Sequence, residues 1–323
     1  MTEQLPDISD QRTTTTARCL INESHRIEAV QTIPTALLVS CYRRDLGIDI
    51  ADEFGQLTEL TLHYCPSCHL HLFYPLVAGS AALYEQLSKR PWYFPDPKFE
   101  YDVAAEHISA GNKVLDIGCG DGRFATRVPA AEYQGLDLAT IEAGTAEGAK
   151  VGCISRQSLH EHAAARPGFY DVCCAFQVLE HVTNPVAFIR QAMDSLKPGG
   201  KLIVGLPNTE SYLGDLVNFT LNSPPHHLSW WSAAALEQLA SMLDIVTVNI
   251  LYAPVEHWEE RLYWMARFAR ADSRYYRSSR WAQVANLIAY AAGCVFERLG
   301  ISVGDNMGST MVWIAEKRGS NRD

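Results

Sequence analysis

The chain has 323 residues and a formal net charge of −10; 47% of its residues are hydrophobic and 20% are charged. This composition is typical of a globular protein that buries a large core in one large or two modest domains. The negative charge argues against general attraction to nucleic acid. Nine cysteines, several of them in predicted core strands, indicate reduced thiols and a cytoplasmic protein rather than a disulfide framework.

The N-terminal part of the chain is expected to form a polar leader and a small module. Residues 1–17 contain a run of four threonines and no apolar stretch, which predicts a frayed leader and no signal peptide. Residues 18–97 are expected to form a small ribbon-like module that ends in a connector rich in proline and aromatic residues. Within it, Cys65-Pro-Ser-Cys68 has the spacing with which two thiolates bind one tetrahedral zinc ion.

A glycine-rich turn between a strand and a helix begins the main fold. The apolar strand 114–117 is followed by Gly118, Gly120 and Gly122 and by a predicted helix at residues 121–128. Glycine lets a ligand approach the backbone without obstruction by a Cβ atom. The start of a helix also offers free N–H groups and a partial positive charge, which suit a carboxylate or phosphate.

Two acids indicate which ligand this turn binds. Asp137 ends the next strand, 19 positions after Gly118, where a carboxylate can accept hydrogen bonds from both hydroxyls of a ribose. Asp116 precedes the first glycine, where it would repel a pyrophosphate and attract an ammonium group. Arg123 occupies the third glycine position of a dinucleotide fingerprint. Ribose hydroxyls, an ammonium group and a carboxylate together describe S-adenosylmethionine.

With these residues the chain resembles the class I S-adenosylmethionine-dependent methyltransferases. Two further motifs carry the resemblance, Phe176-Gln-Val-Leu-Glu-His-Val182 and Leu196-Lys-Pro-Gly-Gly200. The similarity covers residues 98–255 and a last strand near residue 310. It is greatest to the broad group that includes ubiquinone-biosynthesis O-methyltransferases and methyltransferases of cell-envelope sugar pathways.

The alternation of apolar strands with helices, together with this resemblance, predicts an α/β fold: a Rossmann-like seven-stranded sheet with helices on both faces. The methyltransferase domain is expected at residues 98–323, with a helical insertion at 255–305 before the last strand. We expect strands near 113–117, 132–137, 151–155, 170–176, 200–206, 244–252 and 309–316, and helices near 99–109, 121–128, 140–148, 184–196 and 231–242.

The resemblance implies S-adenosylmethionine as the cofactor, bound at the carboxyl ends of the strands. Trp92 or Tyr93 of the connector either covers the cofactor or docks the module onto the main domain. The acid that usually holds the adenine in this family is absent near Ser158. The residues expected at the cofactor are Asp116, Gly118, Cys119, Gly120, Asp137, Leu138, Ser158, Leu159, Phe176 and Gln177.

Methyltransferases similar to this chain often carry an N-terminal zinc ribbon whose first half is a second C-x-x-C. Here Cys19 is followed three positions later by Asn22, and neither His25 nor Cys41 has the spacing of a ribbon ligand. Two alternatives remain open: zinc bound through Cys65 and Cys68, or a metal-free ribbon that is held by its apolar residues.

Methyl transfer needs alignment of the acceptor and often a base, for which histidine has a suitable pKa. His181 follows the fourth core strand and should lie at the rim of the pocket, as the base or as a structural cap. His226 and His227 follow two prolines, and one of them should face the substrate. Metal binding by this pair is not expected, since no matching carboxylate spacing accompanies it. Asn208, after the fifth strand, is a candidate hydrogen-bond partner of the substrate.

The insertion combines basic and apolar features. Four arginines share one face of a predicted helix: Arg267, Arg270, Arg274 and Arg277. An apolar helix follows at 281–296, too short to span a bilayer. Three interpretations remain: a solvated face beside a helix that packs on the core or on a twin subunit, a membrane-surface segment, or a basic lid over an anionic substrate.

We therefore expect S-adenosylmethionine-dependent methyl transfer to an oxygen or nitrogen of a small-molecule, sugar or lipid-linked acceptor. The expected setting is the cytoplasm, with peripheral contact to the inner face of a membrane or formation of a homodimer through the insertion. The alternative is a protein that binds the cofactor without methyl transfer, or with another reaction, and acts at membrane surfaces through the basic insertion.

Overall fold

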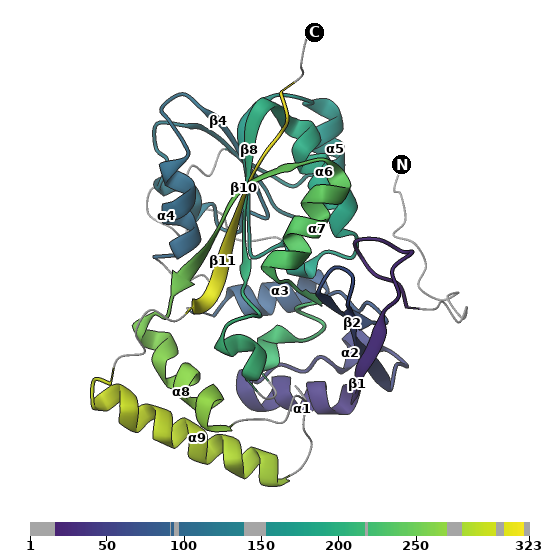
Figure 1. The fold of residues 1–323 in the computed structure, drawn as a ribbon, viewed down its shortest axis with the longest axis vertical. Coiled ribbons are helices and arrows are strands. Elements are labelled where there is room, and N and C mark those ends of the chain that lie inside the picture. Colours follow the sequence, from purple (N-terminus) through teal and green to yellow (C-terminus); the bar gives the residue numbers. More distant parts are fainter. Residues whose placement is uncertain are drawn as a thin grey trace.

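The described residues form two β-sheets, one of seven strands and one of four (Figure 1). The structure is a computed structural model and describes residues 17–90, 92–93, 97–138, 153–216, 219–269, 280–301 and 307–319. The predicted leader, except for residue 17, and the predicted helix at 140–148 lie outside these ranges.

The seven-stranded sheet has the order β10-β11-β8-β7-β4-β5-β6. Neighbouring strands from β8 to β6 are parallel, while β11 runs antiparallel to both β8 and β10. The predicted α/β sheet is therefore confirmed. Its strands are β4 (Lys113–Ile117), β5 (Glu132–Leu136), β6 (Ile154–Ser155), β7 (Tyr170–Phe176), β8 (Leu196–Pro207), β10 (Val246–Pro254) and β11 (Met307–Glu316).

Helices cover both faces of this sheet because successive strand residues point to opposite sides. On β4, Val114 belongs to the apolar cluster beneath α4 (Phe99–Glu106), whereas Leu115 belongs to the cluster that includes residues of α6 and α7. The second face carries α5 (Leu159–Ala165), α6 (Pro185–Ser195) and α7 (Ala233–Leu243) (Figure 1). Ser232 caps α7, since its hydroxyl accepts a hydrogen bond from the Ala235 N–H.

The helix predicted at 121–128 is wrong in type and length. Only the short 3₁₀ helix η2 (Arg123–Thr126) forms there. Gly122 adopts a left-handed φ of 76°, and the Asp121 carboxylate accepts a hydrogen bond from the Arg123 N–H, so this stretch does not continue as an α-helix. An anion site at the start of a full helix is therefore not available at this turn.

The four-stranded sheet has the order β1-β2-β3-β9 and contains β1 (Glu28–Pro34), β2 (Glu59–Cys65), β3 (Leu70–Tyr74) and β9 (Ser229–Trp230). The last of these comes from the loop before α7, far along the chain. The sheet packs with α1 (Thr35–Leu46), α2 (Ala51–Phe54) and α3 (Ala81–Ser88) around its own apolar core. Through β9, this sheet is hydrogen-bonded to the segment that contains His226 and His227.

The insertion between β10 and β11 forms a helical pair, α8 (Glu260–Ala269) and α9 (Arg280–Arg298), at one end of the molecule (Figure 1). Of the four arginines predicted on one face, Arg267 is described and exposed. The other three, Arg270, Arg274 and Arg277, lie outside the described residues. Within the described part of the chain, no helix has the length and apolar character needed to cross a bilayer.

Candidate functional site

The glycine turn after β4 is fixed by hydrogen bonds to the end of β5. The N–H groups of Gly118 and Cys119 both donate to the Leu136 carbonyl, at 2.8 and 3.0 Å. The Gly120 N–H donates to Oδ2 of Asp137 at 2.8 Å. Gly118 has a φ of 71°, and a Cβ atom there would lie 2.5 Å from a methyl group of Val178. The turn is therefore held directly beneath the segment that follows β7.

Asp116 is the least satisfied side chain of this turn. It is 1% exposed, and its Oδ2 accepts a hydrogen bond from the Tyr133 hydroxyl at 2.6 Å. Its Oδ1 is buried and has no hydrogen-bond partner among the described residues. Burial raises the pKa of this carboxyl to about 7. A buried acceptor without a donor is uncommon in folded proteins, and the ammonium group of S-adenosylmethionine would supply the missing donor.

Several residues expected at the cofactor are engaged within the fold. The Ser158 hydroxyl caps α5 in a capping box with Glu161. The Phe176 ring packs 4.9 Å from the rings of both Tyr101 and Phe124. The Leu159 side chain is buried. For these residues, contact with the cofactor stays a prediction.

The remaining three residues differ in their environment. Gln177 adopts a φ of 57°, and its side-chain amide donates to Glu100 at 3.3 Å. Cys119 is buried, which raises the pKa of its thiol. Leu138 is 74% exposed, and the residues directly after it, 139–152, lie outside the described part of the chain.

The three predicted catalytic histidines lie together at the carboxyl end of β7. His181 belongs to η4 (Leu179–His181), and His226 and His227 precede β9. The His181 ring lies 4.5 Å from that of His226 and 4.9 Å from that of His227. The Leu228 N–H donates to the Glu180 carbonyl at 2.8 Å, which ties the two segments together.

The hydrogen bonds of the three rings are consistent with one tautomer, with the proton on Nδ1. His181 Nδ1 contacts the His226 carbonyl. His226 Nδ1 lies 3.0 Å from the Leu221 carbonyl, and His227 Nδ1 lies 3.0 Å from Oδ1 of Asn222. In each case the acceptor is an oxygen, so the ring nitrogen must donate. The lone pairs are therefore on the Nε2 atoms.

Glu180 is a site residue that the sequence analysis did not select. Its carboxyl is 1% exposed, and neither oxygen has a hydrogen-bond partner among the described residues. Its Oε1 lies 3.6 Å from Nε2 of His181 and 3.8 Å from Nε2 of His227. The Glu-His step of the motif was visible in the sequence, but burial of the acid between two imidazoles was not.

Burial keeps this group of side chains uncharged. It raises the pKa of the Glu180 carboxyl to about 8 and lowers the pKa of His181 to about 4. The pKa values of His226 and His227 are also lowered well below the usual value by burial. At neutral pH, a protonated carboxyl therefore lies beside neutral imidazoles that are able to accept a proton.

The N-terminal module contributes two tyrosines to the same place. The Tyr93 hydroxyl lies 3.0 Å from Nε2 of His226, and the Tyr84 hydroxyl lies 3.2 Å from Nδ1 of His181. Trp92, the other aromatic residue considered for this role, is 47% exposed. Lys98 was also missed: its positive charge acts on both Asp116 and Glu180, partly offsetting the effect of burial on their pKa values.

The predicted substrate partner Asn208 is hydrogen-bonded within the fold, and the predicted zinc ligands Cys65 and Cys68 lie in the N-terminal module. Asn208 is fully buried, and its side-chain amide donates to the Gly308 carbonyl at 3.3 Å, within the fold. Cys65 ends β2 and Cys68 lies in the turn before β3, and the side chains of Cys19 and His25, from the segment before β1, lie close to both. Sγ of Cys19 lies within hydrogen-bond distance of Sγ of Cys68, and this contact lowers the pKa of the Cys19 thiol.

Two depressions in the protein surface lie at the opposite, amino end of the parallel strands. One, of about 640 Å³, is lined by residues that include His160, Leu196 and Lys317. The other, of about 230 Å³, is lined by residues that include Asp171 and Lys197. None of the residues predicted at the cofactor lines either depression.

Comparison with known proteins gives consistent matches. A family model described as a methyltransferase domain matches residues 93–245. The ubiquinone biosynthesis O-methyltransferase of Marinobacter nauticus is 31% identical over 175 residues, which cover 46% of this chain and 72% of that protein. That of Sodalis glossinidius is 35% identical over 105 residues, which cover 30% of this chain and 42% of that protein. This chain spans about half the length of the first curated relatives that it matches.

Among solved structures, a SAM dependent methyltransferase from Archaeoglobus fulgidus is 19% identical, with a TM-score of 0.40. The match covers 67% of this chain and 94% of that one.

Proposed function

Because the chain belongs to the class I S-adenosylmethionine-dependent methyltransferase family, we propose that it transfers a methyl group to a hydroxyl oxygen of a small or lipid-linked acceptor. The cluster of three imidazoles, two of which lie beside the Glu180 carboxyl, is the observation that carries this proposal. A hydroxyl attacks far better as its proton leaves, whereas a neutral amine already has a free lone pair, so the cluster favours oxygen over nitrogen. The names of the curated relatives support the same choice.

Residues of the glycine turn would hold the cofactor. Asp116 offers the unsatisfied Oδ1 to its ammonium group, and Asp137 offers carboxylate oxygens to its ribose hydroxyls. When bound, the cofactor supplies a methyl group that is already activated on a sulfonium. The protein therefore has to align the acceptor and to manage one proton.

His181 and His227 are the candidate bases. In both rings Nδ1–H faces an oxygen, which leaves the Nε2 lone pair available for the proton of an acceptor hydroxyl. Glu180 lies next to both Nε2 atoms and acts as a positioning residue. An ionised Glu180 would stabilise the imidazolium that forms when one of these rings takes the acceptor proton, and the imidazolium would pass that proton to water once the product leaves.

Incubation with tritiated S-adenosylmethionine and a panel of phenols, sugars and amines tests the proposal. We expect label in one or more hydroxyl compounds. Label confined to amines would contradict the choice of oxygen. Absence of label from every acceptor, in a protein that binds the cofactor, would favour the non-catalytic alternative.

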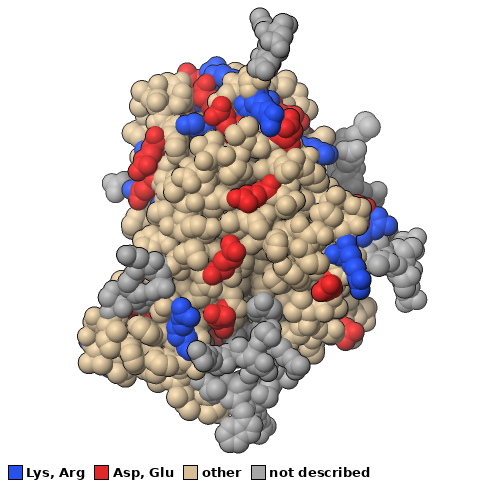
Figure 2. Space-filling model, in the orientation of Figure 1, with Lys and Arg blue, Asp and Glu red and all other residues tan. Residues whose placement is uncertain are grey.

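We further propose that the α8–α9 pair contacts a lipid surface, which suits a lipid-linked acceptor and a cytoplasmic protein at the inner face of a membrane. Exposed apolar side chains form one stripe along α9, and the lobe that contains it is largely tan in Figure 2. Leu287 and Leu299 are 70% and 68% exposed. The stripe consists of Val284, Leu287, Ile288 and Val295 of α9 and of Leu299 directly after the helix.

Vesicle sedimentation tests this contact. The wild-type protein should pellet with anionic vesicles, and the double variant Leu287→Glu, Ile288→Glu should stay in the supernatant. Val248→Glu is the matched control, because Val248 is exposed on β10, outside the stripe. A dimeric mass by light scattering without vesicle binding would assign the stripe to a second copy of the chain instead.

A further inference from the structure

We propose that Cys19, His25, Cys65 and Cys68 bind one zinc ion. Their four ligand atoms lie within 4.8 Å of one another. Sγ of Cys19 lies 3.4 Å from Sγ of Cys68, and Sγ of Cys65 lies 3.6 Å from Nδ1 of His25. With Zn–S of about 2.3 Å and Zn–N of about 2.0 Å, ligand atoms around a tetrahedral zinc ion are about 3.5–3.8 Å apart. Both separations are within a few tenths of an ångström of this range.

A turn at Asn22 brings the fourth ligand to the site. Oδ1 of Asn22 accepts hydrogen bonds from the Ser24 N–H at 3.0 Å and from the Ser24 hydroxyl at 2.8 Å. The Asn22 carbonyl accepts a further bond from the His25 N–H at 2.9 Å. This turn reverses the chain and directs His25 back toward Cys19. Asn22 therefore shapes the loop, and the ligand lies three positions further along the chain.

The other two ligands lie on a tight turn between β2 and β3. The His69 N–H donates to the Cys65 carbonyl at 2.7 Å, and His69 adopts a φ of 57°. Cys65 and Cys68 are fully buried, and Cys19 is 2% exposed. Three thiols and one imidazole in a buried, four-ligand arrangement form a donor set that selects zinc over magnesium or calcium.

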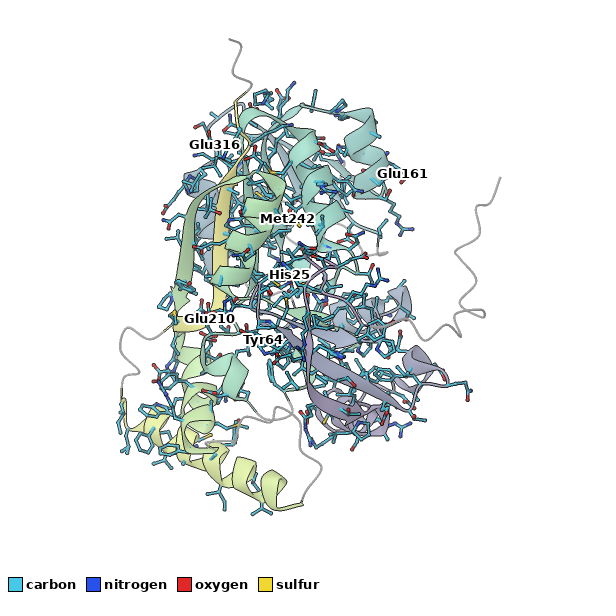
Figure 3. All side chains as sticks on the ribbon, turned by 45° about the vertical axis from the view of Figure 1, so that its right-hand side comes forward. His25, Tyr64, Glu161, Glu210, Met242 and Glu316 are labelled. Atoms are coloured by element: carbon cyan, nitrogen blue, oxygen red, sulfur yellow. The ribbon has the colours of Figure 1, made fainter. Side chains whose placement is uncertain are left out.

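The site lies where the N-terminal module meets the methyltransferase sheet. Figure 3 labels His25 and Tyr64 at this boundary, with Met242 of α7 above them. Cys19, Cys65 and Cys68 belong to the same apolar cluster as Trp231 and residues of α7. Zinc would therefore fix the module to the core of the large domain.

The same turn is connected to the histidine loop. The His69 carbonyl accepts a hydrogen bond from the Ser232 hydroxyl at 3.1 Å, and the Phe73 N–H donates to the Leu228 carbonyl at 2.9 Å. The two contacts hold Leu228, which directly follows His227, and Ser232, five positions after it. We therefore expect zinc to act as a positioning element for the proposed bases, with no direct contact to the substrate.

Elemental analysis of the purified chain tests the site directly. We expect about one zinc per chain in the wild type and loss of most of it in His25→Ala and Cys19→Ala. His25→Cys should retain the metal, because a fourth thiolate can replace the imidazole. Cys41→Ala is the matched control, since Cys41 is a buried free thiol outside the cluster, and it should also retain zinc.

Cobalt substitution gives a second readout that does not depend on activity or on the folding of a variant. The wild type should show the visible ligand-field bands of a tetrahedral cobalt–thiolate site. Absence of these bands, with wild-type zinc no higher than in His25→Ala, would overturn the proposal. A Cys19–Cys68 disulfide found by mass spectrometry in freshly purified protein would also overturn it.

Kinetics separate this inference from the proposed function. Removal of zinc by a chelator should lower kcat and raise KM for the acceptor while the Kd for S-adenosylmethionine stays unchanged. An unchanged kcat in the metal-free protein would contradict the positioning role. A protein with bound zinc and no methyl transfer would refute the proposed function alone.

Discussion

Two aspartates on neighbouring strands show how differently the two ends of the same sheet are built. Asp171, at the start of β7, accepts hydrogen bonds from the Lys113 N–H and from the Lys197 ammonium group. Burial alone would raise its pKa, but these bonds outweigh burial and the pKa is lowered. Asp116, at the end of β4, accepts a hydrogen bond from the Tyr133 hydroxyl through Oδ2, whereas its Oδ1 has no partner among the described residues. Burial raises the pKa of this carboxyl to about 7.

This difference teaches that surface shape alone does not identify the site. The depression near Asp171 is lined by polar groups that the fold itself satisfies. The carboxyl end holds two buried acids, Asp116 and Glu180, that have oxygen atoms without a partner among the described residues. Buried acids that lack hydrogen-bond donors and have strongly shifted pKa values are typical of sites that bind a ligand or transfer a proton. Four changes test the comparison, beginning with the largest expected effect.

Removal of either candidate base should have the largest effect. For His181→Ala and His227→Ala we expect kcat to fall about 100- to 10,000-fold, because proton transfer loses its acceptor. The Kd for S-adenosylmethionine, measured by calorimetry, should change little. His162→Ala is the control, since this buried histidine on α5 binds the Tyr170 hydroxyl instead. An unchanged kcat in both site variants would remove the base from the mechanism.

Asp116→Asn should weaken the binding of S-adenosylmethionine about 100-fold, because a buried charge-assisted contact is lost. Asp171→Asn, its counterpart at the other end of the sheet, should leave this Kd unchanged and lower the stability instead. Calorimetric titration measures the first effect and urea unfolding the second. Equal affinities for the two variants would contradict the functional difference between the two ends.

The ligand-free protein should lose stability as the pH rises from about 6.5 to 8. In this window the folded state holds a proton on Glu180, whose pKa is about 8, while the unfolded state does not, so a higher pH favours unfolding. Asp116 adds to this loss only up to about pH 7. The buried histidines have lowered pKa values and act in the opposite direction, but only below about pH 6.5.

The slope should be at most about 1.4 kcal/mol per pH unit above pH 7, where Glu180 dominates, and steeper between pH 6.5 and 7, where Asp116 contributes a second proton. Urea unfolding at pH 6.5, 7 and 8 measures it, and Glu180→Gln should remove the part above pH 7. The same slope in wild type and variant would show that Glu180 is already ionised in the folded protein.

Tyr133→Phe should have the smallest effect. It removes the hydroxyl that donates to Oδ2 of Asp116 and leaves the ring in place. We expect the affinity for S-adenosylmethionine to fall about fivefold, in line with one hydrogen bond of about 1 kcal/mol. Calorimetry measures the change, and a loss as large as that of Asp116→Asn would mean that Tyr133 itself contacts the ligand.

The strands of the large sheet could be predicted from the sequence because each is a short apolar run next to turn residues. The 3₁₀ helix η2 could not, because the competing hydrogen bond that the Arg123 N–H donates to the Asp121 carboxylate depends on the local conformation. The two-residue strand β9 has no periodic pattern of its own. Its pairing with β3 became visible only in the structure, and it brings the module to the histidine loop.

The candidate site was predictable where its signal is local. Asp116 and the glycines lie in one motif, and His181 lies in another. Glu180 was passed over because a sequence does not show that an acid is buried without a partner. His25 was set aside because its spacing is unusual, and only the turn at Asn22 explains how it reaches Cys19 and the other two thiols.

A crystal structure of the chain soaked with S-adenosylmethionine tests the central claim most directly, because it shows which end of the sheet binds the ligand. The account predicts the ammonium group within hydrogen-bond distance of Oδ1 of Asp116 and the ribose at Asp137, beside the glycine turn. Density in the depression lined by His160 and Lys317, or an Asp116 pocket filled by the protein's own side chains, would contradict it.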